Sequence, residues 1–359
     1  PARHGLHVAG DWPEFDLAEW LALRAGAPGG RRLADWLGPV DVHLDRARVL
    51  GFEFLDVTAR LEPGADSWRV VASGPMADGT VSIPADFAGS EPLALDMRML
   101  VLQAATAVPA GQSQETSDPR ELPAIAARVE EFTWQGRRFG RLDAQLDRVP
   151  QGLRLARLAT ESQAFTLDGS GSWFVEDDGP RTRLTLEFAS GDFGAAARAL
   201  GYRDSVDAEK VRASAKVNWR GGPAEDALER LEGTVHLELD RGKLREVEPG
   251  AGRMLGLLSV VDLPRRLALD FRDVTERGLA FAKVRGDFEM RAGSAYTSNL
   301  LLEGPAVDIG VVGRTGLVAQ DYDQTVAVSG NPSGPITVAG ALAGGPVGAA
   351  GALLFSQLF

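Results

Sequence analysis

Few residues of this sequence have the spacing that a catalytic or metal-binding site requires. His4 and His7 form an HxxH pair, but two histidines fall short of a four-ligand metal site, and a chance pairing is the expected explanation. Residues 321–323 read DYD, like the start of a calcium loop, but Val326 stands where an EF-hand loop needs glycine. We therefore expect no metal site.

Motifs for covalent catalysis and for cofactor binding are also missing from the sequence. The chain has no cysteine, and it contains no G-x-S-x-G, P-loop or dinucleotide-binding pattern. No pair of carboxylates that could act on a glycoside stands out among the 50 acidic residues. We expect no catalytic residue and no cofactor, and a carbohydrate-active β-solenoid enzyme is kept as an alternative.

Apolar contact is the chemistry that the residue spacing does support. Apolar and polar residues alternate in RTRLTLEFAS (181–190), TVHLELDRGKL (234–244), LALDF (267–271) and AVDIGVV (306–312). Because successive side chains of a strand point to opposite faces, each stretch presents one apolar face and one polar face. The residues that we expect to form the apolar face are Leu184, Leu186, Phe188, Val235, Leu237, Leu239, Leu267, Leu269, Phe271, Val307, Ile309 and Val311.

These apolar rows require an antiparallel sheet with one covered face and one face in water. The 42 glycines and 20 prolines suit many short strands, and hairpin turns are expected at 63–66, 150–152 and 291–294. We predict a mainly β fold, an elongated, twisted antiparallel β-sheet curled into an open groove, with a few short helices. A closed β-sandwich or a β-solenoid would show the same alternation and remains an alternative.

A loose repeat of four- or five-strand meanders begins near residues 39, 130 and 267. We therefore interpret residues 1–359 as one elongated β-groove segment. Its approximate modules are residues 1–120, 121–230 and 231–330.

Short helical segments are expected to interrupt the strands. The candidates are residues 15–23, 191–202 and 223–233, and Asp16 and Asp192 are predicted N-caps of the first two.

The C-terminal residues 331–359 contain no charged side chain. Residues 347–359 form a helix candidate that is too short to span a bilayer, which takes about 20 residues. We predict a C-terminal helical segment that either docks on the end of the β-structure or contacts a membrane or lipid.

Charge and composition restrict the partners and the cellular location. The formal net charge is −12 and no basic stripe is present, so we expect no nucleic-acid partner. The sequence shows no signal peptide and no apolar run of about 20 residues. It begins with Pro1 rather than methionine, so we expect a fragment from which an anchor could have been removed. The lack of cysteine suits either a reducing cytosol or a periplasmic protein.

Residues 250–359 resemble the C-terminal region of YhdP-type proteins, which are members of the AsmA-like family of Gram-negative bacteria. The segments that carry the resemblance are GRMLGLLS (252–259), LPRRLALDFRDV (263–274), LLEGPAVDIGVVGR (301–314), DYDQTVAV (321–328) and GALAGGPVGAA (340–350). The segments LEFASGDFGAAARALGY and AGDWPEFDLAEWL extend the resemblance towards the N-terminus with less specificity.

This resemblance implies the periplasmic region of an inner-membrane-anchored protein whose β-groove lets phospholipid move between inner and outer membrane, alongside TamB-like relatives. It implies contact with acyl chains and both membranes, outer-membrane lipid homeostasis as the role, and periplasmic or inner-membrane protein partners. Arg265 and Arg266 would then lie at the groove rim and meet anionic head groups, although a solvated turn explains them equally well. The alternative function is a structural scaffold for outer-membrane biogenesis without lipid conduction.

The dimensions of a strand agree with such a role. A strand of about 6–8 residues is about 20–26 Å long, and half of a bilayer's hydrocarbon core is about 15 Å thick. One acyl chain therefore fits along one strand. Each Leu or Phe left in water costs about 1.5–3 kcal/mol, so an apolar row must be covered by protein or by lipid.

Overall fold

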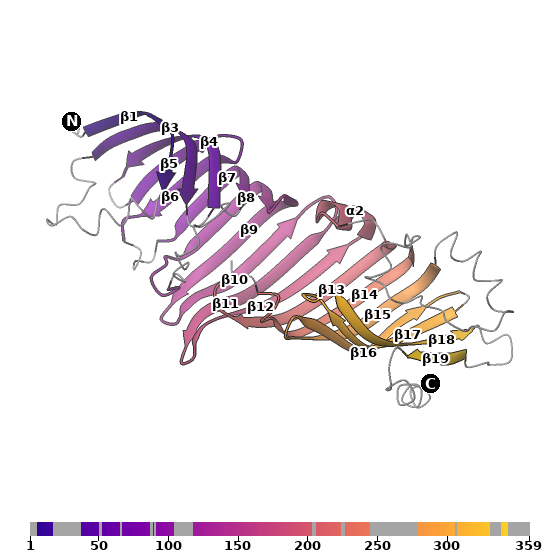
Figure 1. The fold of residues 1–359 in the computed structure, drawn as a ribbon. Coiled ribbons are helices and arrows are strands. Elements are labelled where there is room, and N and C mark those ends of the chain that lie inside the picture. The colour runs from indigo at the N-terminus through magenta and orange to yellow at the C-terminus, as the bar shows by residue number, and fades with distance from the viewer. Residues whose placement is uncertain are drawn as a thin grey trace. The chain divides into compact units, whose positions relative to one another are not determined.

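The computed structural model describes residues 6–16, 37–49, 52–64, 67–86, 89, 91–103, 118–202, 206–223, 227–244, 279–305, 307–330 and 339–343. Within these residues the protein contains nineteen strands and one α-helix, α2 (Phe193–Ala199). Figure 1 shows most of these strands as arrows lying side by side, with α2 beside the start of β13. The prediction of a mainly β fold with few short helices is confirmed.

Contacts divide the chain into two units. Unit 1 comprises Pro1–Gln163 and Ser170–Pro180, and unit 2 comprises Ala164–Gly169 and Arg181–Phe359. The strands of unit 1 are β1 (Leu6–Trp12), β2 (Phe15–Asp16), β3 (Leu37–Val49), β4 (Phe52–Pro63), β5 (Ser67–Ser73), β6 (Ala77–Pro84), β7 (Leu93–Leu102), β8 (Ile125–Trp134), β9 (Arg137–Val149) and β10 (Gly152–Glu161). β11 (Thr166–Glu176) and β12 (Gly179–Ser190) contribute residues to both units. Unit 2 continues with α2, β13 (Val206–Arg220), β14 (Glu232–Leu244), β15 (Leu279–Arg291), β16 (Ser294–Glu303), β17 (Val307–Gly316), β18 (Asp321–Gly330) and β19 (Ala339–Ala343).

In unit 1 the strands from β3 to β10 pair in chain order. The pairs are antiparallel except for β7 with β8, which is parallel, and β1 and β2 both pair in parallel with β3. Four antiparallel pairs in succession, from β3 to β7, give β7 the same direction as β3. Because β8 is parallel to β7, β3 and β8 begin at the same edge of the sheet. The first two copies of the sequence repeat begin within these two strands.

In unit 2 each strand from β12 to β19 pairs antiparallel with the next one. The expected turn at 291–294 is confirmed, since Ala292 and Gly293 both have positive φ, as a tight two-residue hairpin requires. The described strands of unit 2 form an open antiparallel arrangement, as predicted, and those of unit 1 form one that is antiparallel except at the three parallel pairs; both are consistent with a groove.

The helix predictions had mixed outcomes. Residues 191–202 do contain α2, and the Asp192 carboxylate accepts a hydrogen bond from the Ala195 amide at 2.9 Å, as an N-cap does. Phe15–Asp16 of the segment 15–23 form β2 beside β3, so these two residues are not helical; residues 17–23, which the predicted N-cap Asp16 would precede, lie outside the described residues.

The predicted helix at 223–233 is wrong in its described part. The Arg230 amide donates to the Ala227 carbonyl in a turn at 2.9 Å, and β14 already begins at Glu232. Gly233 pairs with Val217 at a φ of 140°, which is far from helical. Pairing with the long strand β13 outweighs the marginal stability of so short a helix.

The predicted C-terminal helical segment also needs a correction. Ala339–Ala343 form β19, which pairs antiparallel with β18 between Thr325 and Val328 and so satisfies backbone polar groups along this part of the edge. The remaining residues of 331–359, including the helix candidate at 347–359, lie outside the described residues. No helix within the described ranges is long and apolar enough to cross a membrane.

The apolar core of each unit lies along one side of its strands. Unit 1 has two buried clusters, Val40, Val42, Leu44, Ala47 and Ala59 over β3 and β4, and Ala77, Met97, Leu100, Val129, Phe132 and Leu142 over β6 to β9. The buried cluster of unit 2 consists of Ala208, Val211, Leu239, Phe281 and Leu302 from β13 to β16.

Candidate functional site

The register of unit 2 brings the predicted apolar residues onto one face. Residues paired in neighbouring strands point to the same side of a sheet. Leu186 pairs with Ala215, Ala215 with Val235, and Val235 with Phe288, which gives an apolar row across β12 to β15. We call the side of the sheet that carries this row the apolar face of unit 2.

A second row crosses five strands. It consists of Leu239, Val284, Leu302, Ile309 and Val328, each paired with the next, on β14 to β18. Both rows belong to the same face, since Leu239 and Val235 are four residues apart on one strand.

Most of the residues predicted to line the groove are therefore on one face. Those placed there are Leu184, Leu186, Phe188, Val235, Leu237, Leu239, Ile309 and Val311. Val307 pairs with Gly330 in the β17–β18 ladder. Leu267, Leu269 and Phe271, and the predicted rim residues Arg265 and Arg266, lie outside the described residues.

Burial differs along the apolar face of unit 2. Around α2 the face is covered: Phe193 of α2 and Phe188 pack against the buried cluster, and the Phe188 ring stacks on Phe165 with centroids 5.3 Å apart. Away from α2, Leu186 and Val235 are half-buried. These side chains retain apolar area that can be covered by another apolar group.

The opposite face of unit 2 is polar and carries ion pairs between strands. Glu238 lies 3.1 Å from the Lys283 ammonium and 3.3 Å from the Arg212 guanidinium. The hydrogen bond from Lys283, followed by that from Arg212, holds the pKa of Glu238 below its usual value.

A second polar group lies on the same face. The Asp287 carboxylate accepts a hydrogen bond from the side-chain Nδ2 of Asn299 at 2.6 Å and contacts His236 Nδ1 at 2.7 Å. Asn299 and then His236 lower the pKa of the Asp287 carboxyl. The sheet of unit 2 thus has an apolar side and a charged, hydrated side.

Unit 1 has an apolar face that the sequence analysis did not assign. One register row across β3 to β10 contains Val42, Ala59, Ala72, Gly79, Met97, Val129, Leu142 and Thr160. The alternation in VDVHL (40–44) was the available signal, since Val40, Val42 and Leu44 are all buried.

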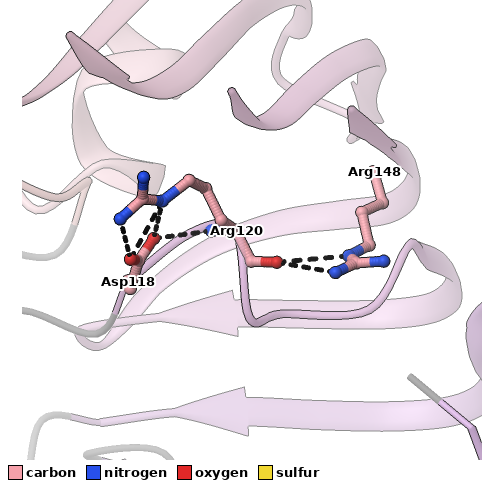
Figure 2. A network of polar contacts seen from close by, with 3 residues as sticks. All are labelled: Asp118, Arg120 and Arg148. Carbon is pink, nitrogen blue, oxygen red and sulfur yellow. Dashed lines mark hydrogen bonds and ion pairs between the residues drawn. The ribbon is translucent and has the colours of Figure 1, made fainter. Parts of the chain in front are cut away.

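A polar network lies beside the β9–β10 hairpin of unit 1 (Figure 2). The Arg120 guanidinium donates to the Asp118 carboxylate, with its shortest bond at 2.6 Å, and lowers the pKa of Asp118. Arg148 donates through Nε and Nη2 to the Arg120 carbonyl at 3.2 and 2.9 Å. Pro119 between them is fully buried.

The described side chains offer apolar surface rather than reactive groups. Within the described ranges, no three His, Asp or Glu side chains lie close enough together to hold a metal ion. The arrangement can hold apolar chains along one face while its other face remains in water.

Comparisons with known proteins agree over the full length of the chain. The sequence profile of the YhdP protein family matches residues 1–359. The chain is also 25% identical over 367 aligned residues to the intermembrane phospholipid transporter YhdP of Escherichia coli strain K12. That alignment covers 99% of this chain and 28% of the relative's length. No solved structure matches the chain. Since the family profile matches every residue from 1 to 359, this chain belongs to the YhdP family.

Proposed function

We propose that this chain is a segment of a non-enzymatic lipid-transport protein whose apolar faces hold phospholipid acyl chains. The observation that carries the proposal is the half-buried apolar row of Leu186, Ala215, Val235 and Phe288, opposite a charged face. The similarity to a relative named as an intermembrane phospholipid transporter supports the same function.

In this proposal, conduction makes and breaks no covalent bond. An acyl chain that covers an apolar row removes apolar area from water, which is favourable by about 0.8 kcal/mol per buried CH₂. Neighbouring rows offer similar Leu, Val and Ala side chains, so a chain moves from one row to the next with a small change in free energy. Head groups stay in water at the ends of the strands, where charge is not desolvated.

The full proposal concerns the longer protein of which this chain would be a part. The sheet curls into an open groove that conducts phospholipid across the periplasm between inner and outer membrane and supports outer-membrane lipid homeostasis. An inner-membrane anchor and periplasmic or inner-membrane protein partners complete it. Leu267, Leu269 and Phe271 line the groove with the other predicted residues, and Arg265 and Arg266 lie at its rim.

Site-specific photocrosslinking in cells tests this proposal. A photoreactive phenylalanine analogue replaces Leu186 or Val235 on the apolar face, with lipid phosphate radiolabelled. Thr185 and Thr234 are matched controls, because both pair with Lys216 on the polar face and both are exposed.

We expect radiolabelled lipid adducts at the first two positions and none at the controls. Equal labelling at all four positions would indicate non-specific adsorption. A folded protein without adducts at Leu186 and Val235 would contradict lipid conduction and leave the scaffold as the better account.

A further inference from the structure

In unit 1 an arginine occupies a strand position that is in phase with the residues facing the apolar side of the sheet. Along β9 the residues facing the apolar side are Leu142, Ala144 and Leu146, and the next residue in this phase is Arg148. Arg148 pairs with Leu153, and Leu146 pairs with Leu155, so the apolar row of β9 and β10 ends in a guanidinium. This end adjoins the hairpin turn at 150–151.

The hydrogen bonds of Arg148 leave its charge without a counter-ion among the contacts of the described residues. Its Nε and Nη2 both donate to the neutral Arg120 carbonyl, while the guanidinium of Arg120 is paired with Asp118. Neither bond uses Nη1 of Arg148. By contrast, Arg154 of the same hairpin donates to the Asp147 carboxylate at 2.9 Å on the polar side.

The surroundings of Arg148 match the two ends of an amphiphile. Leu153 is 2% exposed, and Leu146 and Leu155 are half-buried. Arg148 itself is exposed to water and fixed through the Arg120 carbonyl. Guanidinium groups bind phosphate oxygens through paired, charge-assisted hydrogen bonds. Since Leu153 is already buried by the protein, an anion without an apolar tail would use only the guanidinium and would leave the exposed parts of Leu146 and Leu155 in water.

We propose that Arg148 is a head-group site that binds the phosphate diester of a phospholipid whose acyl chains lie on the apolar side of β9 and β10. This inference rests on the proposed lipid-transport function and adds a polar contact to it. The backbone of residues 118–120 orients the guanidinium, and the Asp118–Arg120 pair keeps the second guanidinium from competing for the phosphate.

Crosslinking at Leu155 in the full chain tests this site. A photoreactive analogue at Leu155 is combined with Arg148→Gln, with Arg148→Lys, or with Arg154→Gln as the matched control from the opposite face. Each protein is exposed to vesicles that contain either radiolabelled phosphatidylglycerol or radiolabelled diacylglycerol with the same acyl chains.

We expect the phosphatidylglycerol adduct to fall about tenfold in Arg148→Gln, as loss of a charge-assisted hydrogen bond implies, and to fall less in Arg148→Lys. The diacylglycerol adduct should not change in either variant, and Arg154→Gln should change neither adduct. Inorganic phosphate should compete weakly, since it lacks the apolar contacts.

Three results would overturn the head-group site. They are an unchanged phosphatidylglycerol adduct in Arg148→Gln, an equal fall for both lipids, which would mean a structural role, and full competition by inorganic phosphate. The proposed lipid transport would survive all three. If the protein with native Arg148 gave no adduct with either lipid at Leu155, Leu186 and Val235, both proposals would fail together.

Discussion

The ion pairs of Glu238 on the polar face of unit 2 should make a contribution to stability that depends on pH. Glu238 is bound by Lys283 and Arg212, and its folded pKa is below the ordinary value. A depressed carboxyl pKa stabilises the fold above the unfolded pKa, and this contribution is lost as pH falls through the lower, folded pKa. The stabilisation by Glu238 should therefore be present at pH 7 and be lost as the pH falls below the ordinary range of a glutamate carboxyl.

Thermal unfolding of Glu238→Gln measures this effect. We expect the variant to melt below the unchanged protein at pH 7 and the two curves to converge towards pH 3. Glu187→Gln, a change at an exposed position of the same face, should shift the melting temperature much less at either pH. A difference that persists undiminished at pH 3 would assign the effect to packing rather than to charge.

At single residues, the sequence predicted the apolar face better than it predicted its exceptions. Leu186 and Val235 follow a plain alternation, and the register confirmed that they share a face. Arg148 was missed, although LDAQLDR (142–148) places it in phase with Leu142 and Leu146. A charged residue at a strand position that faces the apolar side can be interpreted only when the neighbouring strands and the contact to Arg120 are known.

Among the secondary-structure elements, α2 depends on the N-cap hydrogen bond of Asp192. The helix has seven residues, too few to be stable without caps and packing, and Asp192 satisfies the Ala195 amide. We expect Asp192→Ala to destabilise unit 2 by about 1 kcal/mol and Asp192→Ser to restore most of the loss, because serine also caps helices.

Urea unfolding followed by the circular dichroism of the full chain compares these variants. If Asp192→Ala and Asp192→Ser lowered the midpoint equally, the carboxylate would act through its charge rather than as a cap. No change in either variant would show that packing of Phe193 and Phe188 suffices to hold α2.

Strands could be predicted from the sequence where apolar and polar residues alternate clearly. The prediction of helix or strand was wrong where pairing with a neighbouring strand determines the secondary structure. β12 and β14 carry clear period-two patterns and were predicted as strands. β19 consists of alanine, glycine and one leucine in AGALA (339–343), which have no strand-forming pattern of their own, and it forms against the edge of β18. The parallel pairing of β7 with β8 was also missed, since alternation specifies faces but not strand direction.

For the whole chain, the proposed cargo should also act as a stabilising ligand. Apolar side chains such as Leu186 stay half-buried without lipid, so lipid that binds the folded state should raise its melting temperature by mass action. We expect removal of co-purified phospholipid to lower the melting temperature by on the order of 5 °C.

Calorimetry of the delipidated chain, before and after lipid is returned, checks this expectation. Added phospholipid should restore the melting temperature, and added glycerol phosphate, which has the head-group chemistry without acyl chains, should not. Identical melting temperatures in all samples would mean that the apolar faces are already satisfied within the protein.

Unit 1 has two places where a strand runs parallel to its neighbour: β3 beside β1 and β2, and β8 beside β7. These two parallel joints have a consequence for how such a protein can change length. Five strands, β3 to β7, lie between the joints, and β8 enters from the same edge as β3. Removing an odd number of strands from a plain antiparallel meander reverses every strand that follows. Here, duplication or deletion of the gene segment for one five-strand block would leave the direction of all later strands unchanged, because the parallel joint compensates for the odd count.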